Sequence, residues 1–158
     1  MHQAVARRKP ALSAILIGGL IAGTLDLTYA IVFSGSHGVP AMRVMQSVAS
    51  GWLGSAAYEG GVPTAILGVL SHYFIMFCAA AVFFAASRRF DFLVRRPVIS
   101  GVVFGLIMYA VMSLVVLPLS AFPHKITFTD PVLVSANLFV HMFFVGVPIS
   151  LAVRRASR

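Results

Sequence analysis

Six polar side chains that could bind a ligand or accept a proton lie inside long apolar stretches of this sequence. Asp26 is the one charged residue in such a stretch, out of 12 Lys and Arg and 4 Asp and Glu residues. A carboxylate near the centre of a membrane helix costs about 2.5–3.5 kcal/mol, so it should face other helices and have a partner. The candidate partners are His72, Tyr109, Ser113, Asn137 and His141.

These six residues lie at similar depths if the apolar stretches are helices that cross a membrane. At a rise of about 1.5 Å per residue, all of them fall roughly 9–15 Å from the outer ends of their helices. Asn137 and His141 lie one turn apart on one face of the same helix. All four helices contribute to this layer, whereas their other halves hold almost no such side chains. We therefore predict a buried polar layer in the outer half of a four-helix bundle.

The layer is compatible with a site that binds or passes protons or another small polar solute. Histidine titrates near neutral pH, and a nearby carboxylate stabilises its charged form. Our first functional hypothesis is therefore a non-enzymatic binding or transport protein with Asp26, His72 and His141 as titratable groups. Four helices are few for alternating access, so such a protein would be expected to form a homo-oligomer.

Two other hypotheses explain the same residues. An Asp26–His72 or Asp26–His141 pair could lock the helices together, as a polar clasp in a structural or accessory subunit of a larger membrane complex. Alternatively, His72 and His141 are at matching depth on different helices, as ligation of a haem b or a metal would require. The sequence itself requires no cofactor. It contains no HExxH motif, serine elbow or metal-binding set of carboxylates, so we expect no enzymatic activity.

The elements that must position these residues are four apolar stretches, each long enough to cross a bilayer. About 20 helical residues span the hydrocarbon core, and backbone groups there must be satisfied within the segment, so the stretches should be helices. Three of them open with proline, which is favoured at the first helical position. We predict an all-α membrane protein with transmembrane helices at residues 11–33, 63–87, 97–119 and 131–153.

Basic residues are distributed unequally between the two ends of these helices. Ten lysine and arginine residues lie in the N-terminal tail (1–10), the 88–96 turn and the C-terminal tail (154–158). The other two connections contain only Arg43 and Lys125. Cytoplasmic segments of membrane proteins are enriched in lysine and arginine. Both termini are therefore predicted to be cytoplasmic.

The connection between the first two helices contains a short amphipathic segment at residues 40–53. Met42, Met45, Val48, Ala49, Trp52 and Leu53 share one helical face, and Arg43, Gln46, Ser47 and Ser50 share the other. We interpret this segment as an interfacial helix on the outer leaflet, anchored in the headgroup layer by Trp52. A re-entrant segment that presents Gln46 and Ser47 to a pathway is the alternative.

Small residues on the predicted spans indicate where helices meet. Close backbone approach drives helix association in lipid, and GxxxG is a common motif for it. Gly19 and Gly23 form this motif on the first helix, and Gly101 and Gly105 form it on the third. Gly68 could have the same role on the second helix. Because Asp26 follows Gly23 by three residues, it should lie on the packed face of the first helix.

Composition excludes several classes of protein. Of the 158 residues, 59% are hydrophobic and only 10% are charged, which indicates lipid as the surrounding solvent and a single integral membrane domain over residues 1–158. The net charge of +8 comes from clusters beside apolar runs, so we do not expect nucleic acid as a partner. The single cysteine, Cys78, excludes an intramolecular disulfide and any multi-cysteine metal site.

Five segments of the chain resemble a family of small, uncharacterised bacterial inner-membrane proteins with four helices. The segments are GGLIAGTLDLTYAIVF, RVMQSVASGWLG, LSHYFIMFCAAAVFFAASRR, VVLPLSAFP and HMFFVGVPISLAVRR, within a resemblance that runs from about Ala11 to Arg155. The resemblance implies the same topology and a location in the bacterial inner membrane. It implies no particular activity, substrate or site.

Overall fold

The computed structural model describes residues 2–124 and 128–157, and this part of the chain is helical without any strand. The first half contains α1 (His2–Ser36), α2 (Ala41–Leu53), the 3-10 turn η1 (Gly54–Tyr58) and α3 (Gly61–Ser87). The second half contains α4 (Phe92–Arg95), α5 (Pro97–Val111), the π-helical turn η2 (Met112–Val116), α6 (Leu117–Leu119), α7 (Pro131–Val140), the π-helical turn η3 (His141–Gly146) and α8 (Val147–Ala156).

Four helical segments in this part of the chain are long and apolar enough to cross a membrane, which confirms that part of the prediction. They are Ala11–Ser36, Gly61–Ser87, Pro97–Leu119 and Pro131–Ala156. The first ends three residues later than expected, the second begins two residues earlier, and the fourth ends three residues later. Residues 2–10, expected as a separate tail, continue α1.

Local chemistry explains where these helices begin and end. Asp130 caps α7 because its side chain accepts hydrogen bonds from the backbone N–H groups of Val132 (2.9 Å) and Leu133 (3.2 Å). Pro131 occupies the first helical position, where its missing N–H costs nothing. Helix α1 ends at Ser36, and the chain then turns at Gly38, whose φ of +80° favours glycine.

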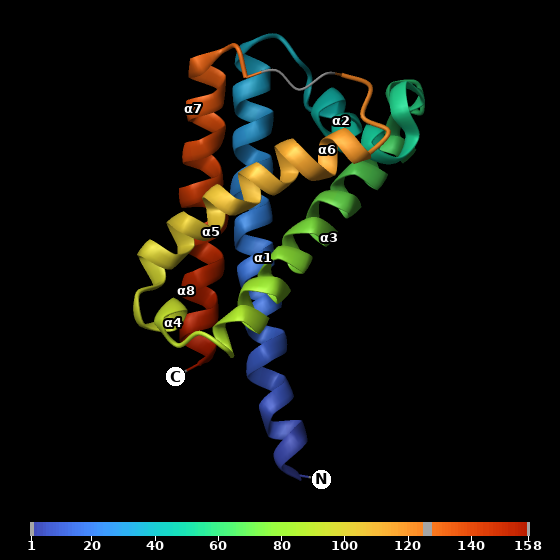
Figure 1. The fold of residues 1–158 in the computed structure, drawn as a ribbon. Coiled ribbons are helices and arrows are strands. Elements are labelled where there is room, and N and C mark those ends of the chain that lie inside the picture. Colours follow the sequence, from blue (N-terminus) through green and yellow to red (C-terminus); the bar gives the residue numbers. More distant parts are fainter. Residues whose placement is uncertain (1, 125–127, 158) are drawn as a thin grey trace.

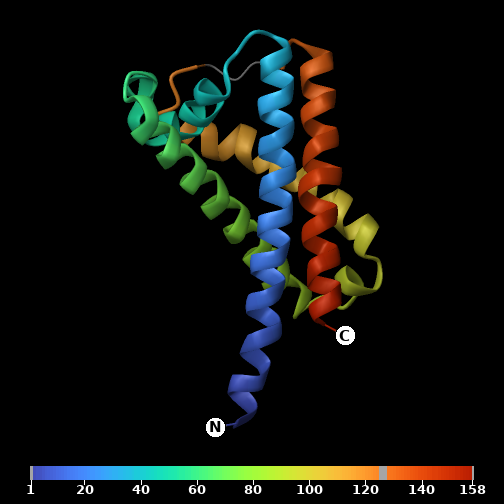
Figure 2. The ribbon, with the colours of Figure 1, turned by 180° about the vertical axis from the view of Figure 1, so that it is seen from behind.

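The helices form a bundle in which α1 is central (Figure 1). The continuous α7–η3–α8 segment runs alongside α1, whereas α3 and the α5–α6 segment cross obliquely, as the view from behind also shows (Figure 2). Both termini lie at one end of the bundle, here called the basic end because the 88–96 turn and the last turn of α8 are also there. The opposite end contains α2 and is called the α2 end.

Glycine residues lie where helices approach most closely. A Cβ on Gly101 would be 2.7 Å from the Cα of Val147, and a Cβ on Gly105 would be 2.5 Å from the Cα of Met142, so α5 meets η3 and α8 backbone to backbone. On α1, Gly23 faces the ring of Tyr73 on α3. The buried core is correspondingly rich in small and apolar residues, namely Ala14, Ala22, Met76, Ala79, Ala80, Phe83, Val145, Ile149 and Val153.

The third and fourth spans are interrupted by π-helical turns that the sequence did not predict. In η2 and η3 the backbone hydrogen bonds reach one residue further than in an α-helix, which inserts an extra residue into the turn. Gly146, at the end of η3, lies directly against the backbone of Gly101 and Gly105. The wider turn therefore coincides with the closest contact between the third and fourth spans.

Helix α2 has nearly the predicted bounds, but the side chains that it buries differ in part from the prediction. Gln46 and Ser50, expected on an exposed polar face, are buried, while Trp52 is 68% exposed. The Gln46 side-chain amide donates to the carbonyl of Gly61 (3.1 Å) and to the hydroxyl of Thr64 (3.3 Å). These bonds explain why Gln46 can be buried, because a buried amide is stable only where it has partners.

Candidate functional site

Asp26 of α1 and His72 of α3 form the one ion pair in the described part of the chain. His72 Nε2 lies 4.0 Å from Asp26 Oδ2, and the two side chains are 8% and 16% exposed, respectively. His72 Nε2 also lies 2.9 Å from the carbonyl oxygen of Gly23. Because a carbonyl only accepts hydrogen bonds, Nε2 must be protonated and donate to it.

The packing of α1 on α3 selects this pair. Gly23 allows the ring of Tyr73 to approach α1, which brings the neighbouring His72 against the same turn. The Tyr73 hydroxyl in turn shares a hydrogen bond with Thr24 Oγ1 at 2.9 Å. Asp26 lies one turn beyond Gly23 and therefore faces α3. The contact made is with His72 and not with His141.

The carboxylate of Asp26 has no hydrogen-bond donor among the described residues. At 4.0 Å, the contact to His72 exceeds hydrogen-bonding distance, and the single Nε2 proton is directed to Gly23. One turn further along α1, the Tyr29 hydroxyl is buried and likewise has no hydrogen-bond partner. Buried polar groups are nearly always satisfied, so the partnerless Tyr29 hydroxyl, one helical turn after the half-buried Asp26, marks a distinctive position on α1.

Three of the remaining predicted residues, Tyr109, Asn137 and His141, form a second cluster on the third and fourth spans. His141, in η3, lies edge-on to the ring of Tyr109 with centroids 5.4 Å apart. Its Nδ1 donates to the carbonyl of Asn137, one turn earlier, at 2.9 Å. Ser113 is buried in η2. Within the described residues, no hydrogen bond, ion pair or ring contact joins this cluster to the Asp26–His72 pair, so the expected single layer is two clusters.

The Asp26–His72 pair lies near the middle of the two spans that contain it. Asp26 is ten residues from Ser36, and His72 is eleven residues from Gly61. At about 1.5 Å per residue, both are about 15 Å along their helices from the α2 end, which is half of a hydrocarbon core of about 30 Å. The longer α1 and α3 thus put this pair nearer the middle of its helices than predicted, whereas the bounds of the other two spans at the α2 end, Leu119 and Pro131, are as predicted.

A haem or metal shared by the two histidines is not favoured by this geometry. His141 has Nε2 available, as ligation requires, but Nε2 of His72 donates to the Gly23 carbonyl, which leaves only Nδ1. The two rings also belong to separate clusters. No group of three or more His, Cys, Asp or Glu side chains able to hold a metal occurs among the described residues.

Trp52 and Gly68 connect α2 to α3. The backbone of Met45 lies directly on Gly68, where an added Cβ would be 2.7 Å from the carbonyl carbon of Met45. The indole N–H of Trp52, predicted as a headgroup anchor, donates to the hydroxyl of Ser71 at 3.1 Å. Ser71 precedes His72 in the sequence, so this bond links α2 to the turn that contains the ion pair.

Two residues of the site were not identified from the sequence. Tyr29 follows Asp26 by three residues, a spacing that places both on one face of α1 and was visible in the sequence. Gly146 follows His141 by five residues, which is not a helical repeat, and only the π-helical turn makes the two part of one contact with α5.

Comparison of the chain with family models, with curated proteins and with solved structures finds no match.

Proposed function

We propose that this chain is a non-enzymatic, four-span protein of the bacterial inner membrane with both termini in the cytoplasm. The basic end supports this orientation, since the 88–96 turn and the end of α8 contribute six arginines there. Only Arg43 and Lys125 lie in the connections of the opposite side. The exposed surface of the spans also supports a lipid environment. Even in Gly61–Ser87, the most buried of the four spans, only 39% of the residues in the apolar stretch are buried.

We further propose that the Asp26–His72 pair binds and releases protons, in a binding or transport role. The observation that carries this proposal is the unsatisfied carboxylate: Asp26 Oδ2 lies 4.0 Å from His72 Nε2 and receives no hydrogen bond from the described residues. A purely structural clasp would be expected to close to about 2.7–2.9 Å, where a charge-assisted bond is strongest. A gap of this size is too narrow for a solute but requires only a small movement to transfer or share a proton.

Protonation has a direct consequence for this pair. Proton uptake by His72 at Nδ1 leaves the bond from Nε2 to Gly23 intact and places a positive ring beside the carboxylate. The pair is then neutral overall, which is favourable at mid-span because a lone charge there is costly. Tyr29, one turn further along α1, has a buried hydroxyl without a hydrogen-bond partner and is therefore a candidate further donor to the carboxylate.

Proton binding can be tested by infrared difference spectroscopy on the purified protein in nanodiscs. Changing the pH between mildly alkaline and mildly acidic values should produce imidazole or carboxyl bands that disappear in both Asp26→Asn and His72→Gln. Glu59→Gln and His37→Gln are the matched controls, because both residues are exposed and lie outside the spans. Identical difference bands in Asp26→Asn and the wild type would contradict the proposal.

Transport is measured separately in sealed liposomes that contain a pH-sensitive dye and are driven by a potassium diffusion potential. We expect wild-type protein and Glu59→Gln to acidify the lumen faster than empty vesicles, and Asp26→Asn to match the empty vesicles. If wild-type protein conducts no protons but retains the titration, the site binds protons without transporting them.

The alternative function is an accessory subunit of a larger membrane complex. The observation that favours it is the exposure of the Pro97–Leu119 span. Only 11% of the residues in its apolar stretch are buried, so a large apolar surface is available for another protein or for lipid. In that case the Asp26–His72 pair is a clasp. Asp26→Asn would then lower the thermal stability of the protein, and no titration would be seen in the infrared experiment.

A further inference from the structure

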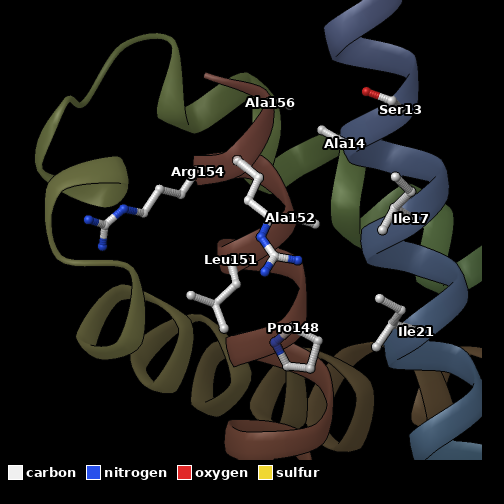
Figure 3. Close-up of a pocket in the computed structure, with 10 residues that line it drawn as sticks. Ser13, Ala14, Ile17, Ile21, Pro148, Leu151, Ala152, Arg154 and Ala156 are labelled. Carbon is white, nitrogen blue, oxygen red and sulfur yellow. The ribbon is translucent and has the colours of Figure 1, made fainter. Parts of the chain in front are cut away.

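A hollow of about 660 Å³ lies between α1 and α8 at the basic end of the bundle (Figure 3). Its walls are apolar: Ile17 and Ile21 of α1 lie on one side, and Pro148 and Leu151 of α8 lie on the other. These isoleucines and Leu151 are 41–53% exposed, although they are large apolar side chains. The hollow is therefore an open apolar groove on the surface that faces lipid in a membrane.

Two positively charged side chains flank the groove at the basic end of the bundle. Arg154 and Arg155, in the last turn of α8, line the same hollow. In the described part of the chain, neither guanidinium is paired with a carboxylate, since the one ion pair there joins Asp26 to His72. Two arginines beside an apolar groove can extend along it while their charged groups remain at the membrane surface.

The groove is long enough to hold part of one lipid chain. From Ser13 to Ile21 the groove follows α1 for eight residues, which corresponds to about 12 Å along the helix. The arginines lie at the basic end of this helix pair, which the proposed orientation puts at the cytoplasmic membrane surface, and the apolar walls lie nearer the middle of the spans. An apolar groove that ends in unpaired cations matches the order of groups in a phospholipid, whose acyl chain is followed by a phosphate.

We propose that this groove binds an anionic phospholipid of the cytoplasmic leaflet. One acyl chain lies along Ile17, Ile21 and Leu151, and the phosphate contacts Arg154 and Arg155. Basic pockets between transmembrane helices on the cytoplasmic side are a known arrangement for anionic headgroups. The proposal rests on the membrane placement of the four spans and is independent of the Asp26–His72 pair.

Native mass spectrometry of the detergent-purified protein tests the headgroup contact. Phosphatidylglycerol should bind more tightly than phosphatidylcholine to the wild type. Arg154→Gln/Arg155→Gln should weaken phosphatidylglycerol about 25-fold, or about fivefold for each arginine, and bring it close to phosphatidylcholine. Arg88→Gln/Arg89→Gln is the matched control, because it removes two arginines at the same end but outside the groove. Equal loss in the two double variants would overturn the proposal.

A second pair of variants tests the acyl-chain contact. Ile17→Trp should fill the groove and abolish phosphatidylglycerol binding, whereas Leu20→Trp, on an exposed face of α1 outside the groove, should leave it unchanged. Glycerol phosphate, which has no acyl chain, should not compete. Competition by glycerol phosphate, or full binding by Ile17→Trp, would show that the groove does not hold the lipid. Asp26→Asn should bind phosphatidylglycerol like the wild type. The lipid experiment therefore does not depend on whether the Asp26–His72 pair binds protons.

Discussion

Replacing Gly105 with alanine should force α5 away from the π-helical turn η3. A Cβ at this position would be 2.5 Å from the Cα of Met142 and closer still to the carbonyl oxygen of His141. Carbon atoms pack at about 3.5–4.0 Å, so the two segments must separate by about 1 Å or more. Both obstacles are backbone atoms, which a change of rotamer cannot move aside. Overpacking of this kind costs about 1–3 kcal/mol, and we expect the upper end of that range.

The assay is thermal unfolding in nanodiscs, followed by circular dichroism. For a chain of this length, a loss of about 3 kcal/mol corresponds to a decrease in Tm of about 6–12 °C. Gly35→Ala is the matched control because Gly35 is also helical but has nothing within 4 Å of an added Cβ. There the same substitution should leave the stability nearly unchanged, because the gain of alanine over glycine is largest in a helix interior and Gly35 is the second-last residue of α1. Equal melting temperatures for the two variants would refute the backbone-contact argument.

Two further substitutions test the positions of α2 and α7. Gly68→Ala should push α2 away from α3 and break the hydrogen bond from Trp52 to Ser71. Trp52 is the only tryptophan, so the maximum of tryptophan fluorescence emission should shift. The control Gly35→Ala should leave this maximum unchanged. An unshifted emission spectrum would show that Gly68 is not needed for this contact. Asp130→Ala should cost about 1 kcal/mol through loss of the α7 cap, and Asp130→Asn should retain most of it; the difference is read from Tm, and equal values for the two variants would exclude capping by this side chain.

The positions of the four spans could be predicted from the sequence because the thickness of a bilayer sets a length that few other segments reach. Their ends were less predictable. Local hydrogen bonds that composition does not reveal determine them, such as the bond from the Ser36 hydroxyl to the carbonyl of Phe33 at 2.7 Å. The two π-helical turns were not predictable either, because their residues have no distinctive composition. They follow from contacts between spans, such as the one at Gly146.

The direction in which the site residues face could not be predicted from the sequence. Counting residues placed Asp26, His72 and His141 at similar depth, and it left both histidines as partners for the carboxylate. The choice depends on the tilt and rotation of whole helices, which counting does not give. In the structure, the contact of Gly23 with Tyr73 turns Asp26 toward α3 and thus toward His72. The burial of Gln46 was missed for a similar reason, since its partners lie on another helix.

The π-helical turn η3 fixes a phase between the two halves of the fourth span. Each α-helical residue turns the chain by about 100°, and the extra residue in η3 offsets α8 from α7 by about that amount. With this offset the hydroxyl of Ser150 meets the carbonyl of Pro97 at 2.6 Å, and Arg154 and Arg155 line the groove beside α1. A substitution in this turn changes one contact, whereas a one-residue deletion would redirect every side chain that follows it. The number of residues between His141 and Ser150 is therefore as much a part of the architecture as their identities.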